Sequence, residues 1–340
     1  MKTMRLLIVG FGIIGTGVVK AILSKKKKLA GEYGAEFQVI GACEKEGSVI
    51  DEKGLDLERL LKAKESGKFS KHPDFKKISA LEAIEKMEAD VMIECTPTNI
   101  SNGEPGLRHI QKALSRGMHV VTSNKGPPVL KYKELEETAK EKGVQFKFEA
   151  TVGGGMPVIN LARKTLHADE IKGIRGILNG TTNFILTKMH DEGVNFETAL
   201  HEAREMGIAE ADPSYDVEGV DAAAKLAILG NALMNKNLIF KDVERTGIDK
   251  VTPEAVDLAK KNGYSIKLLA VIEDDHVGVS PQLIPSKHPL NVDGTLNALM
   301  LETDLAKEIV VVGRGAGQME TASAVLSDLV DIAEETEAKN

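Results

Sequence analysis

The sequence predicts an α/β protein with an N-terminal parallel sheet and a second, α+β domain. Three observations support this prediction. The chain has 340 residues, of which 42% are hydrophobic and 28% charged, enough for two domains with separate cores. Short apolar runs alternate with helical patterns over residues 1–150. After a glycine cluster at 153–155 this alternation stops, and later strands follow one another with only short turns.

The elements of the first domain follow from the alternation between apolar and helical patterns. Strands are predicted at 4–10, 37–43, 90–96, 118–125 and 144–150, with helices between them, for example at 106–117 and 131–143. Residues 44–80 are more polar and are predicted to form an irregular excursion with one short helix. The repeated order of strand, helix and strand predicts a parallel sheet covered on both faces.

The second half of the chain carries closely spaced helix signals and then strands. Helices are predicted at 157–166, 181–191, 195–207, 221–235 and about 318–336, and strands at 170–178, 265–274, 276–284, 297–304 and 308–313. This order favours a mixed or antiparallel sheet with helices. The predicted division is 1–150, then 151–312, then a glycine turn and helix at 313–340 that return to the first domain.

Composition excludes several classes of protein. The net charge of −7 disfavours nucleic acid or an acidic membrane as a partner. The uncharged run at 6–19 has 14 residues, too few to span a bilayer. The two cysteines, Cys43 and Cys95, offer neither a disulfide framework nor zinc spacing. They are expected to be reduced thiols, which suggests a cytoplasmic protein.

A G-x-G-x-x-G motif follows the first predicted strand and opens a helix, the context in which this motif binds a dinucleotide. Its glycines allow a tight turn, close approach of a pyrophosphate, and close packing of helix on strand. The alternative is a purely structural glycine turn. The predicted cofactor-binding residues of this Rossmann-type turn are Gly10, Phe11, Gly12, Ile13, Ile14 and Gly15.

Other cofactor-binding candidates follow the carboxyl ends of later strands, where ligands of open α/β sheets bind. Glu44 is placed to bond the ribose of NAD, whereas Lys45 could meet the 2′-phosphate of NADP, so NAD, NADP or both remain open. Thr96 and Pro97 follow the strand at 90–96, and Lys125 ends the next one. The alternatives are an ordinary turn after the strand and a solvent-facing loop lysine.

The helix predicted at 221–235 is mostly apolar, yet Asp221 and Lys225 share one of its faces. The simplest interpretation is an exposed ion pair that contributes only a few tenths of a kcal/mol. Carboxylates also gather just upstream, at Glu210 and Asp216. Gly180 and Thr181 lie between a strand and a helix, where Thr182 or Asn183 could act as a cap. The three consecutive glycines at 153–155 suit either an ion-binding nest or a hinge.

Taken together, these segments resemble the homoserine dehydrogenase family over essentially the whole chain. The resemblance rests on "VGFGIIG", "CTPTN", "TSNKGP", "EATVGGGMPVI", "ILNGTTNFIL", "AEADPSYDVEGVDAAAKLAILG" and "GRGAGQMETASAVLSDL". It implies a Rossmann domain, a substrate and dimerisation domain, and usually a homodimer. It also implies reversible reduction of L-aspartate 4-semialdehyde to L-homoserine with NADPH or NADH, a step toward threonine, methionine and isoleucine.

The resemblance also implies roles for individual residues. Lys225 corresponds to the proton-transfer lysine, and Lys125 to one that contacts both cofactor and substrate. The Asp221–Lys225 pair is therefore expected to face the crevice rather than bulk water. The implied substrate-binding residues are Glu210, Asp216, Asp221, Gly180 and Thr181, and Gly317 is implied to reach the nucleotide. Glu149, with the backbone oxygens of Val152, Gly154 and Met156, corresponds to a structural monovalent-cation site, typically sodium. A short form without a C-terminal regulatory domain, insensitive to threonine, is expected.

In the expected mechanism a hydride passes from the reduced nicotinamide to the aldehyde carbon, and Lys225 serves as general acid. Two rival functions fit the sequence less well. Aspartate semialdehyde dehydrogenase chemistry needs a cysteine nucleophile, but both cysteines precede the substrate domain. A nucleotide sensor would need no lysine and carboxylates on the helix at 221–235. Turnover with aspartate semialdehyde separates a sensor from an enzyme, because a sensor consumes no cofactor.

Overall fold

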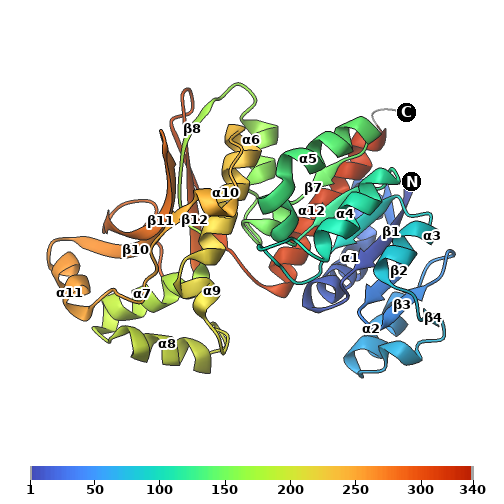
Figure 1. The fold of residues 1–340 in the computed structure, drawn as a ribbon, viewed down its shortest axis with the longest axis horizontal. Coiled ribbons are helices and arrows are strands. Elements are labelled where there is room, and N and C mark those ends of the chain that lie inside the picture. Colours follow the sequence, from blue (N-terminus) through green and yellow to red (C-terminus); the bar gives the residue numbers. More distant parts are fainter. Residues whose placement is uncertain (1, 338–340) are drawn as a thin grey trace. The chain divides into compact units, whose positions relative to one another are not determined.

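The computed structural model describes residues 2–337 and divides the chain into two compact units. Unit 1 comprises Met1–Thr151 and Gly317–Asn340, and unit 2 comprises Val152–Ala316. Unit 1 is therefore made of two separate stretches of the chain, and Figure 1 shows the last helix, α12, in the same unit as the N-terminal elements. The predicted α/β architecture, with a parallel sheet followed by a mixed-sheet domain, is confirmed.

Unit 1 is built on a seven-stranded sheet in the order β4-β3-β2-β1-β5-β6-β7. The strands are β1 (Lys2–Val9), β2 (Ala35–Glu44), β3 (Gly47–Ile50), β4 (Phe75–Lys76), β5 (Val91–Glu94), β6 (His119–Thr122) and β7 (Phe146–Lys147). Five neighbouring strands of this sheet, β2, β1, β5, β6 and β7, pair in parallel, as predicted. All carboxyl ends of these five strands consequently lie at one edge of the sheet, the edge at which such folds bind ligands.

Helices cover this sheet because its strands are apolar on both faces. The helices of unit 1 are α1 (Ile13–Glu32), α2 (Leu57–Glu65), α3 (Ala80–Lys86), α4 (Gly106–Ser115), α5 (Gly126–Lys142) and α12 (Gln318–Glu337). Successive side chains of a strand point to opposite faces, and Met4, Leu6 and Ile8 of β1 share one core with buried residues of α1 and α12. Helix α4 packs against β5 and β6 and against α5.

Two segments of unit 1 differ from the sequence-based expectation. Residues 44–80 contain an added antiparallel pair, β3 and β4, as well as α2, and Ser79 begins α3 with a capping box to Glu82. The strand predicted at 144–150 is only β7, because a 3-10 turn at Glu149–Thr151 follows it at once. Phe148, just before that turn, and Ala150 within it are buried, and they gave the misleading apolar signal.

Unit 2 is built on a six-stranded mixed sheet in the order β13-β12-β8-β10-β11-β9. The strands are β8 (Ile171–Ile177), β9 (Glu244–Arg245), β10 (Tyr264–Glu273), β11 (His276–Pro285), β12 (Leu296–Thr303) and β13 (Glu308–Arg314). The helices are α6 (Ile159–Thr165), α7 (Gly180–Glu192), α8 (Phe196–Glu205), α9 (Ser214–Val217), α10 (Val220–Met234) and α11 (Pro253–Lys261). Helices α7 and α10 pack on the sheet, and nearly every residue of α10 from Asp221 to Asn231 is buried.

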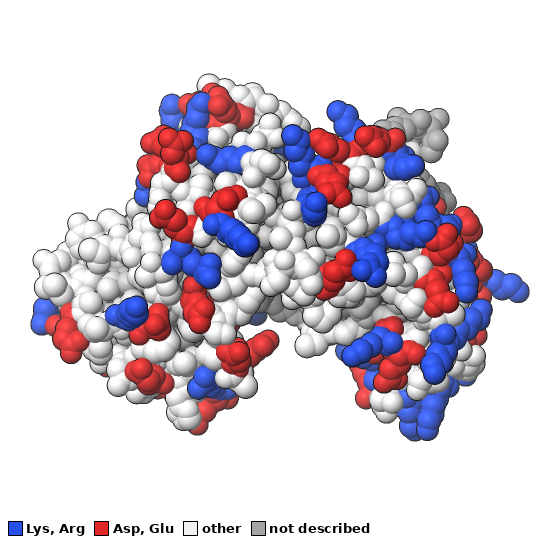
Figure 2. Space-filling view, in the orientation of Figure 1, with Lys and Arg blue, Asp and Glu red and all other residues white. Residues whose placement is uncertain are grey.

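The distribution of surface charge and the length of the helices relate to the expectation that nucleic acid and membranes are not partners. In Figure 2 acidic and basic side chains are interspersed over both units on the visible face, with no large field of one sign. Within residues 2–337, none of the helices is both long and apolar enough to cross a bilayer.

Candidate active site

The glycine turn after β1 is shaped to receive a phosphate group. Its backbone is fixed to the end of β2, because Gly10 N and Phe11 N both donate to the Cys43 carbonyl, at 3.0 and 3.1 Å. A Cβ at Gly10, which has φ +92°, would lie 2.5 Å from the Cys95 carbonyl carbon, so only glycine fits. A Cβ at Gly12 would instead meet nothing within 4 Å. The open space at Gly12, beside the N-terminus of α1, suits the pyrophosphate of a dinucleotide.

The other predicted residues of this turn contribute in different ways. Gly15 lies against the carbonyl of Gly10, where a Cβ would come within 2.4 Å of the oxygen, so it sets the packing of helix on strand. The Phe11 ring is fully buried, 5.8 Å from the Phe69 ring, so only its backbone is available to a ligand. The side chain of Ile13 is 72% exposed, whereas Ile14 is half-buried against the core.

Helix α12 begins beside this same turn. The Gln318 amide donates to the Ile13 carbonyl at 2.8 Å and to the Thr16 hydroxyl at 3.2 Å. Gly317, which precedes it, has φ +135°, a conformation that glycine adopts readily. The structure therefore brings Gly317 close to the N-terminus of α1 although 300 residues separate them in sequence.

Three further candidates lie at the carboxyl ends of strands in unit 1. Glu44 ends β2, and its carboxylate forms an ion pair with Lys64 of α2. Thr96 and Pro97 follow β5, and Asn124 joins them to the loop after β6 by donating to the Thr96 hydroxyl at 3.2 Å. Lys125 is half-buried at the start of α5, and its backbone N lies 3.4 Å from the Thr98 hydroxyl.

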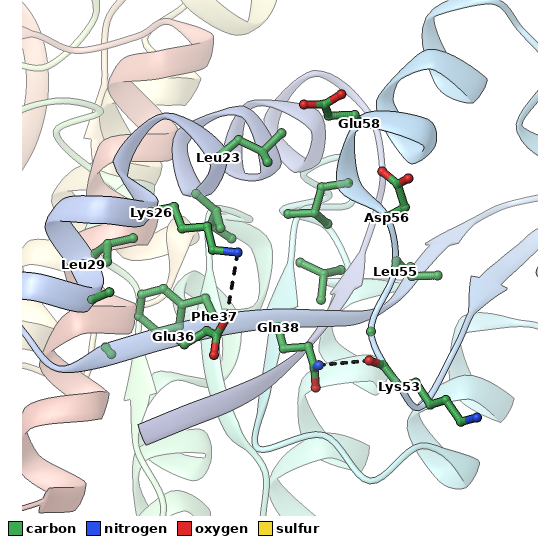
Figure 3. Close-up of a pocket in the computed structure, with 16 residues that line it drawn as sticks. Leu23, Lys26, Leu29, Glu36, Phe37, Gln38, Lys53, Leu55, Asp56 and Glu58 are labelled. Atoms are coloured by element: carbon green, nitrogen blue, oxygen red, sulfur yellow. Dashed lines mark hydrogen bonds and ion pairs between the residues drawn. The ribbon is translucent and has the colours of Figure 1, made fainter. Parts of the chain in front are cut away.

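A separate cavity of about 510 Å³ lies at the opposite end of α1. Figure 3 shows it between α1, the first half of β2 and the loop at 53–58, with Lys26 paired to Glu36 at 3.9 Å across it. Its lining includes none of the candidate residues, so it is distinct from the glycine turn.

In unit 2, Asp221 and Lys225 form a buried ion pair rather than an exposed one. Lys225 Nζ lies 2.7 Å from Asp221 Oδ2 and donates to the Leu178 carbonyl, also at 2.7 Å. The two residues are only 6% and 7% exposed. These bonds use two of the three protons that an ammonium group carries. A buried ion pair contributes little to stability because its desolvation cost is high, so this pair calls for a functional explanation.

Asn179 connects this pair to a second carboxylate, and sequence reasoning did not place it in the site. Its amide nitrogen donates to Asp216 Oδ1 at 2.7 Å and to Asp221 Oδ2 at 3.0 Å. Its side-chain oxygen caps α7 by accepting from Thr182 N at 2.9 Å. The signal in the sequence was the Asn-Gly pair at a strand-to-helix junction, which we expected to be capped one turn later.

The carboxylates of this cluster are buried close together, and the pKa values of two groups are raised. Burial, followed by repulsion from Asp221, raises the pKa of Asp216. Burial likewise raises the pKa of Tyr215, with Asp221 and Asp216 adding to the effect. The Tyr215 hydroxyl is buried and has no hydrogen-bond partner among the described residues. Excess negative charge of this kind favours binding of a cationic group.

The remaining substrate-binding candidates lie at differing distances from this cluster. Gly180 begins α7, and a Cβ there would lie 2.8 Å from the Thr295 carbonyl oxygen, so a larger residue would displace the helix start. The Thr181 hydroxyl donates to the Ile208 carbonyl at 3.2 Å and also helps to stabilise the Asp216 carboxylate. Glu210 is exposed in the turn before α9, and it takes part in none of the ion pairs found among the described residues.

The predicted cation ligands are divided between the two units. Glu149, 2% exposed, belongs to unit 1, and its backbone N donates to Asp328 Oδ2 at 3.0 Å. Val152, Gly154 and Met156 belong to unit 2, where the Met156 carbonyl accepts from Val158 N at 3.0 Å. In the described part of the chain no group of three or more His, Cys, Asp or Glu could hold a metal ion. The site predicted here contains a single carboxylate and stays a prediction.

Comparisons with known proteins agree with this geometry. Residues 157–330 match the family model for homoserine dehydrogenase, and residues 10–149 match the model for its NAD-binding domain. A homoserine dehydrogenase from Methanocaldococcus jannaschii is 54% identical over 97% of this chain and 98% of its own length. An NAD(+)-dependent homoserine dehydrogenase from Pseudomonas canavaninivorans is 36% identical over 98% of this chain and 97% of its own.

Solved structures are similar over the same extent. A crystal structure from Archaeoglobus fulgidus, assigned to the same family, superposes with a TM-score of 0.90 at 42% identity, covering 97% of this chain and 99% of that one. A hyperthermophilic archaeal homoserine dehydrogenase in complex with NADPH gives a TM-score of 0.85 at 31% identity, covering 98% of each chain. The matched features are those of an NAD(P)-dependent oxidoreductase with homoserine dehydrogenase activity. The chain belongs to the homoserine dehydrogenase family.

Proposed function

We propose that this chain interconverts L-aspartate 4-semialdehyde and L-homoserine, with Lys225 as the proton-transfer group. The observation that carries the proposal is the buried Asp221–Lys225 pair, linked through Asn179 to Asp216. A nicotinamide cofactor, when bound, would supply the hydride in reduction and accept it in oxidation. Lys225 has one proton beyond its two bonds, and we propose that it donates to the substrate oxygen as the alkoxide forms.

The carboxylates are proposed to hold the substrate ammonium. Burial, followed by repulsion from Asp221, raises the pKa of Asp216, and Lys225 supplies one positive charge for the two carboxylates, which leaves one negative charge unbalanced when both are ionised. A bound ammonium would balance it with charge-assisted hydrogen bonds. Glu210, Gly180 and Thr181 are proposed to line the same pocket, and Lys125 to contact both the nucleotide and the substrate.

The test is a set of initial rates with L-homoserine and each oxidised nucleotide, measured by the absorbance of the reduced product. We expect turnover with wild-type protein and with the exposed control Lys250→Ala, and a loss of at least about 10²-fold in kcat with Lys225→Ala. Turnover of a different hydroxy acid in preference to homoserine would contradict the proposal. Consumption of no nucleotide would point to a sensor instead.

We propose that both NAD and NADP are used. Glu44 is placed to accept from a ribose hydroxyl, but Lys64 already holds its carboxylate, which weakens the repulsion of a 2′-phosphate. The related proteins bind NAD in one case and NADPH in the other. Glu44→Ala should therefore lower kcat/KM more with NAD than with NADP. An unchanged ratio of the two values would show that Glu44 does not contact the ribose.

Four finer expectations of the family resemblance are also proposed: a sodium site, a homodimer, a cytoplasmic location and a role in amino-acid synthesis. A structural sodium site at Glu149, Val152, Gly154 and Met156 predicts that Glu149→Ala lowers the Tm in sodium buffer and abolishes its dependence on sodium. A homodimer is proposed because the family resemblance implies it. Light scattering of the native protein tests it. The buried thiol of Cys43 suits the reducing cytoplasm, and the reaction suits threonine, methionine and isoleucine synthesis.

A further inference from the structure

The loop after β5 is held by a buried carboxylate that none of the roles above uses. Glu94 is the last residue of β5 and is 0% exposed. Its Oε1 accepts from Thr96 N at 2.8 Å and also from the Thr96 hydroxyl. Its Oε2 lies 2.9 Å from Nδ1 of His109, which is 6% exposed on α4. The carboxylate thus joins the residue that follows its strand to a neighbouring helix.

Asn124 extends this network into the second loop. Its amide nitrogen donates to the Thr96 hydroxyl oxygen at 3.2 Å and lies 3.4 Å from the Pro97 carbonyl, while its side-chain oxygen accepts from Gly126 N at 3.0 Å. The space is tight, since a Cβ on Gly106 would lie 2.5 Å from the Asn124 amide nitrogen. The loops carrying Thr96 and Lys125 are therefore held by one chain of hydrogen bonds.

The carboxylate of Glu94 sets the donor-to-acceptor direction of the hydrogen bonds in this network. An ionised carboxylate only accepts hydrogen bonds, so the Thr96 proton turns toward Glu94 and the Thr96 lone pairs remain for Asn124. Burying a carboxylate costs several kcal/mol before compensation, and a neutral side chain could close the same turn without that cost. The second carboxylate oxygen, which lies 2.9 Å from His109 Nδ1, therefore gives the side chain a use beyond closing the turn.

We propose that Glu94, supported by His109, is a positioning residue that fixes Thr96, Pro97 and Lys125 to receive the nicotinamide end of the nucleotide. This inference rests on the proposed function, which makes those three residues cofactor contacts. Glu94 does not itself touch the ligand. Because its carboxylate is buried and fully hydrogen-bonded, the two loops have one low-energy arrangement. Less conformational entropy of these loops is therefore lost when the nucleotide binds.

Substitutions separate positioning from simple loss of structure. Glu94→Gln retains an oxygen that can accept both Thr96 bonds, so we expect the dissociation constant for the nucleotide to stay within about threefold of wild type. Glu94→Ala leaves Thr96 N and the Thr96 hydroxyl without their acceptor. We expect its nucleotide dissociation constant to rise about tenfold or more and kcat to fall about 10-fold to 100-fold, the scale on which misplaced reacting groups lose rate.

The experiment measures the dissociation constants of NADH and NADPH by nucleotide fluorescence, at a temperature well below each variant's Tm. Initial rates and the primary isotope effect with 4-deuterated nucleotide are measured alongside. Glu137→Ala, which removes an exposed carboxylate from α5 of the same unit, is the matched control and should match wild type. Thr96→Val should also weaken nucleotide binding. In the double variant with Glu94→Ala, the loss of binding free energy should be smaller than the sum of the two single losses, because both residues act through one network.

The outcomes separate this inference from the proposed function. If folded Glu94→Ala binds nucleotide within about twofold of wild type, or if its effect adds fully to that of Thr96→Val, the positioning role is wrong. If Glu94→Ala does not fold, unchanged nucleotide binding by Thr96→Val overturns it equally. If wild type binds nucleotide but leaves homoserine unoxidised, the proposed function fails, whereas the binding comparison still decides the role of Glu94.

Discussion

The two units each bury a charged cluster, and the clusters are satisfied in opposite ways. In unit 1, Glu94 accepts from the backbone and hydroxyl of Thr96 and contacts His109, all groups of its own unit. In unit 2, Asp216 and Asp221 crowd together, and the pKa of Asp216 is raised. A carboxylate that its own unit satisfies holds structure in place. Carboxylates left with excess charge are suited to a cationic ligand, so burial alone does not reveal which role a charge has.

The largest effect is expected from a substitution that removes the ammonium group of the unit 2 cluster. Lys225→Ala should lower kcat by about 10²–10⁴-fold with a smaller change in KM, because the lost interaction belongs mainly to the transition state. Ala is a good helix former, so α10 should persist. Steady-state kinetics and the Tm, compared with those of Lys250→Ala, check this expectation. Near-wild-type turnover would shift the assignment to Lys125.

A smaller effect is expected from removing one negative charge. Asp221→Asn can still accept a hydrogen bond from Lys225 but cannot neutralise a substrate ammonium. We expect kcat/KM for homoserine to fall about 10-fold to 100-fold, corresponding to about 1.5–3 kcal/mol for a bond to a charged group. KM and kcat should both change, and nucleotide affinity should not. A change in nucleotide affinity alone would place Asp221 outside the substrate pocket.

The raised pKa of Asp216 makes a prediction about stability and pH. The folded protein keeps this proton to a higher pH than the unfolded chain, so ionisation of Asp216 costs stability as the pH rises through the interval between the two pKa values. Relative to Asp216→Asn, wild type should therefore lose stability on going from about pH 4, where aspartate ordinarily titrates, toward neutrality. Urea unfolding of both proteins across that range measures the difference. A constant difference would mean that the pKa is not raised.

The smallest expected effect concerns Tyr215. Its hydroxyl is buried without a partner among the described residues, so Tyr215→Phe removes a desolvated group. We expect the free energy of unfolding to rise by about 1 kcal/mol. Urea unfolding at neutral pH gives the value. A clear loss of stability would show that the hydroxyl is bonded in solution, and that the cluster is more fully satisfied than it appears in unit 2.

Sequence reasoning reached the features that depend on local pattern. The parallel pairing of five strands follows from alternation of strand and helix, and the Gly10 turn from glycine spacing. The antiparallel pair β3 and β4 was missed because these strands have four and two residues. Asn179 and Glu94 were missed for another reason. Each acts through partners distant in sequence, Asp216 and His109, and no periodicity indicates such contacts.

The composition of unit 1 from two stretches has a consequence for synthesis on the ribosome. The glycine turn is made before unit 2, but α12, whose Ala322, Val325 and Leu329 belong to the core beneath it, is made after unit 2. The emerging chain must therefore hold an unfinished apolar face through all of unit 2 before its first domain can close. Nucleotide binding at the glycine turn is therefore expected only after α12 has been synthesised.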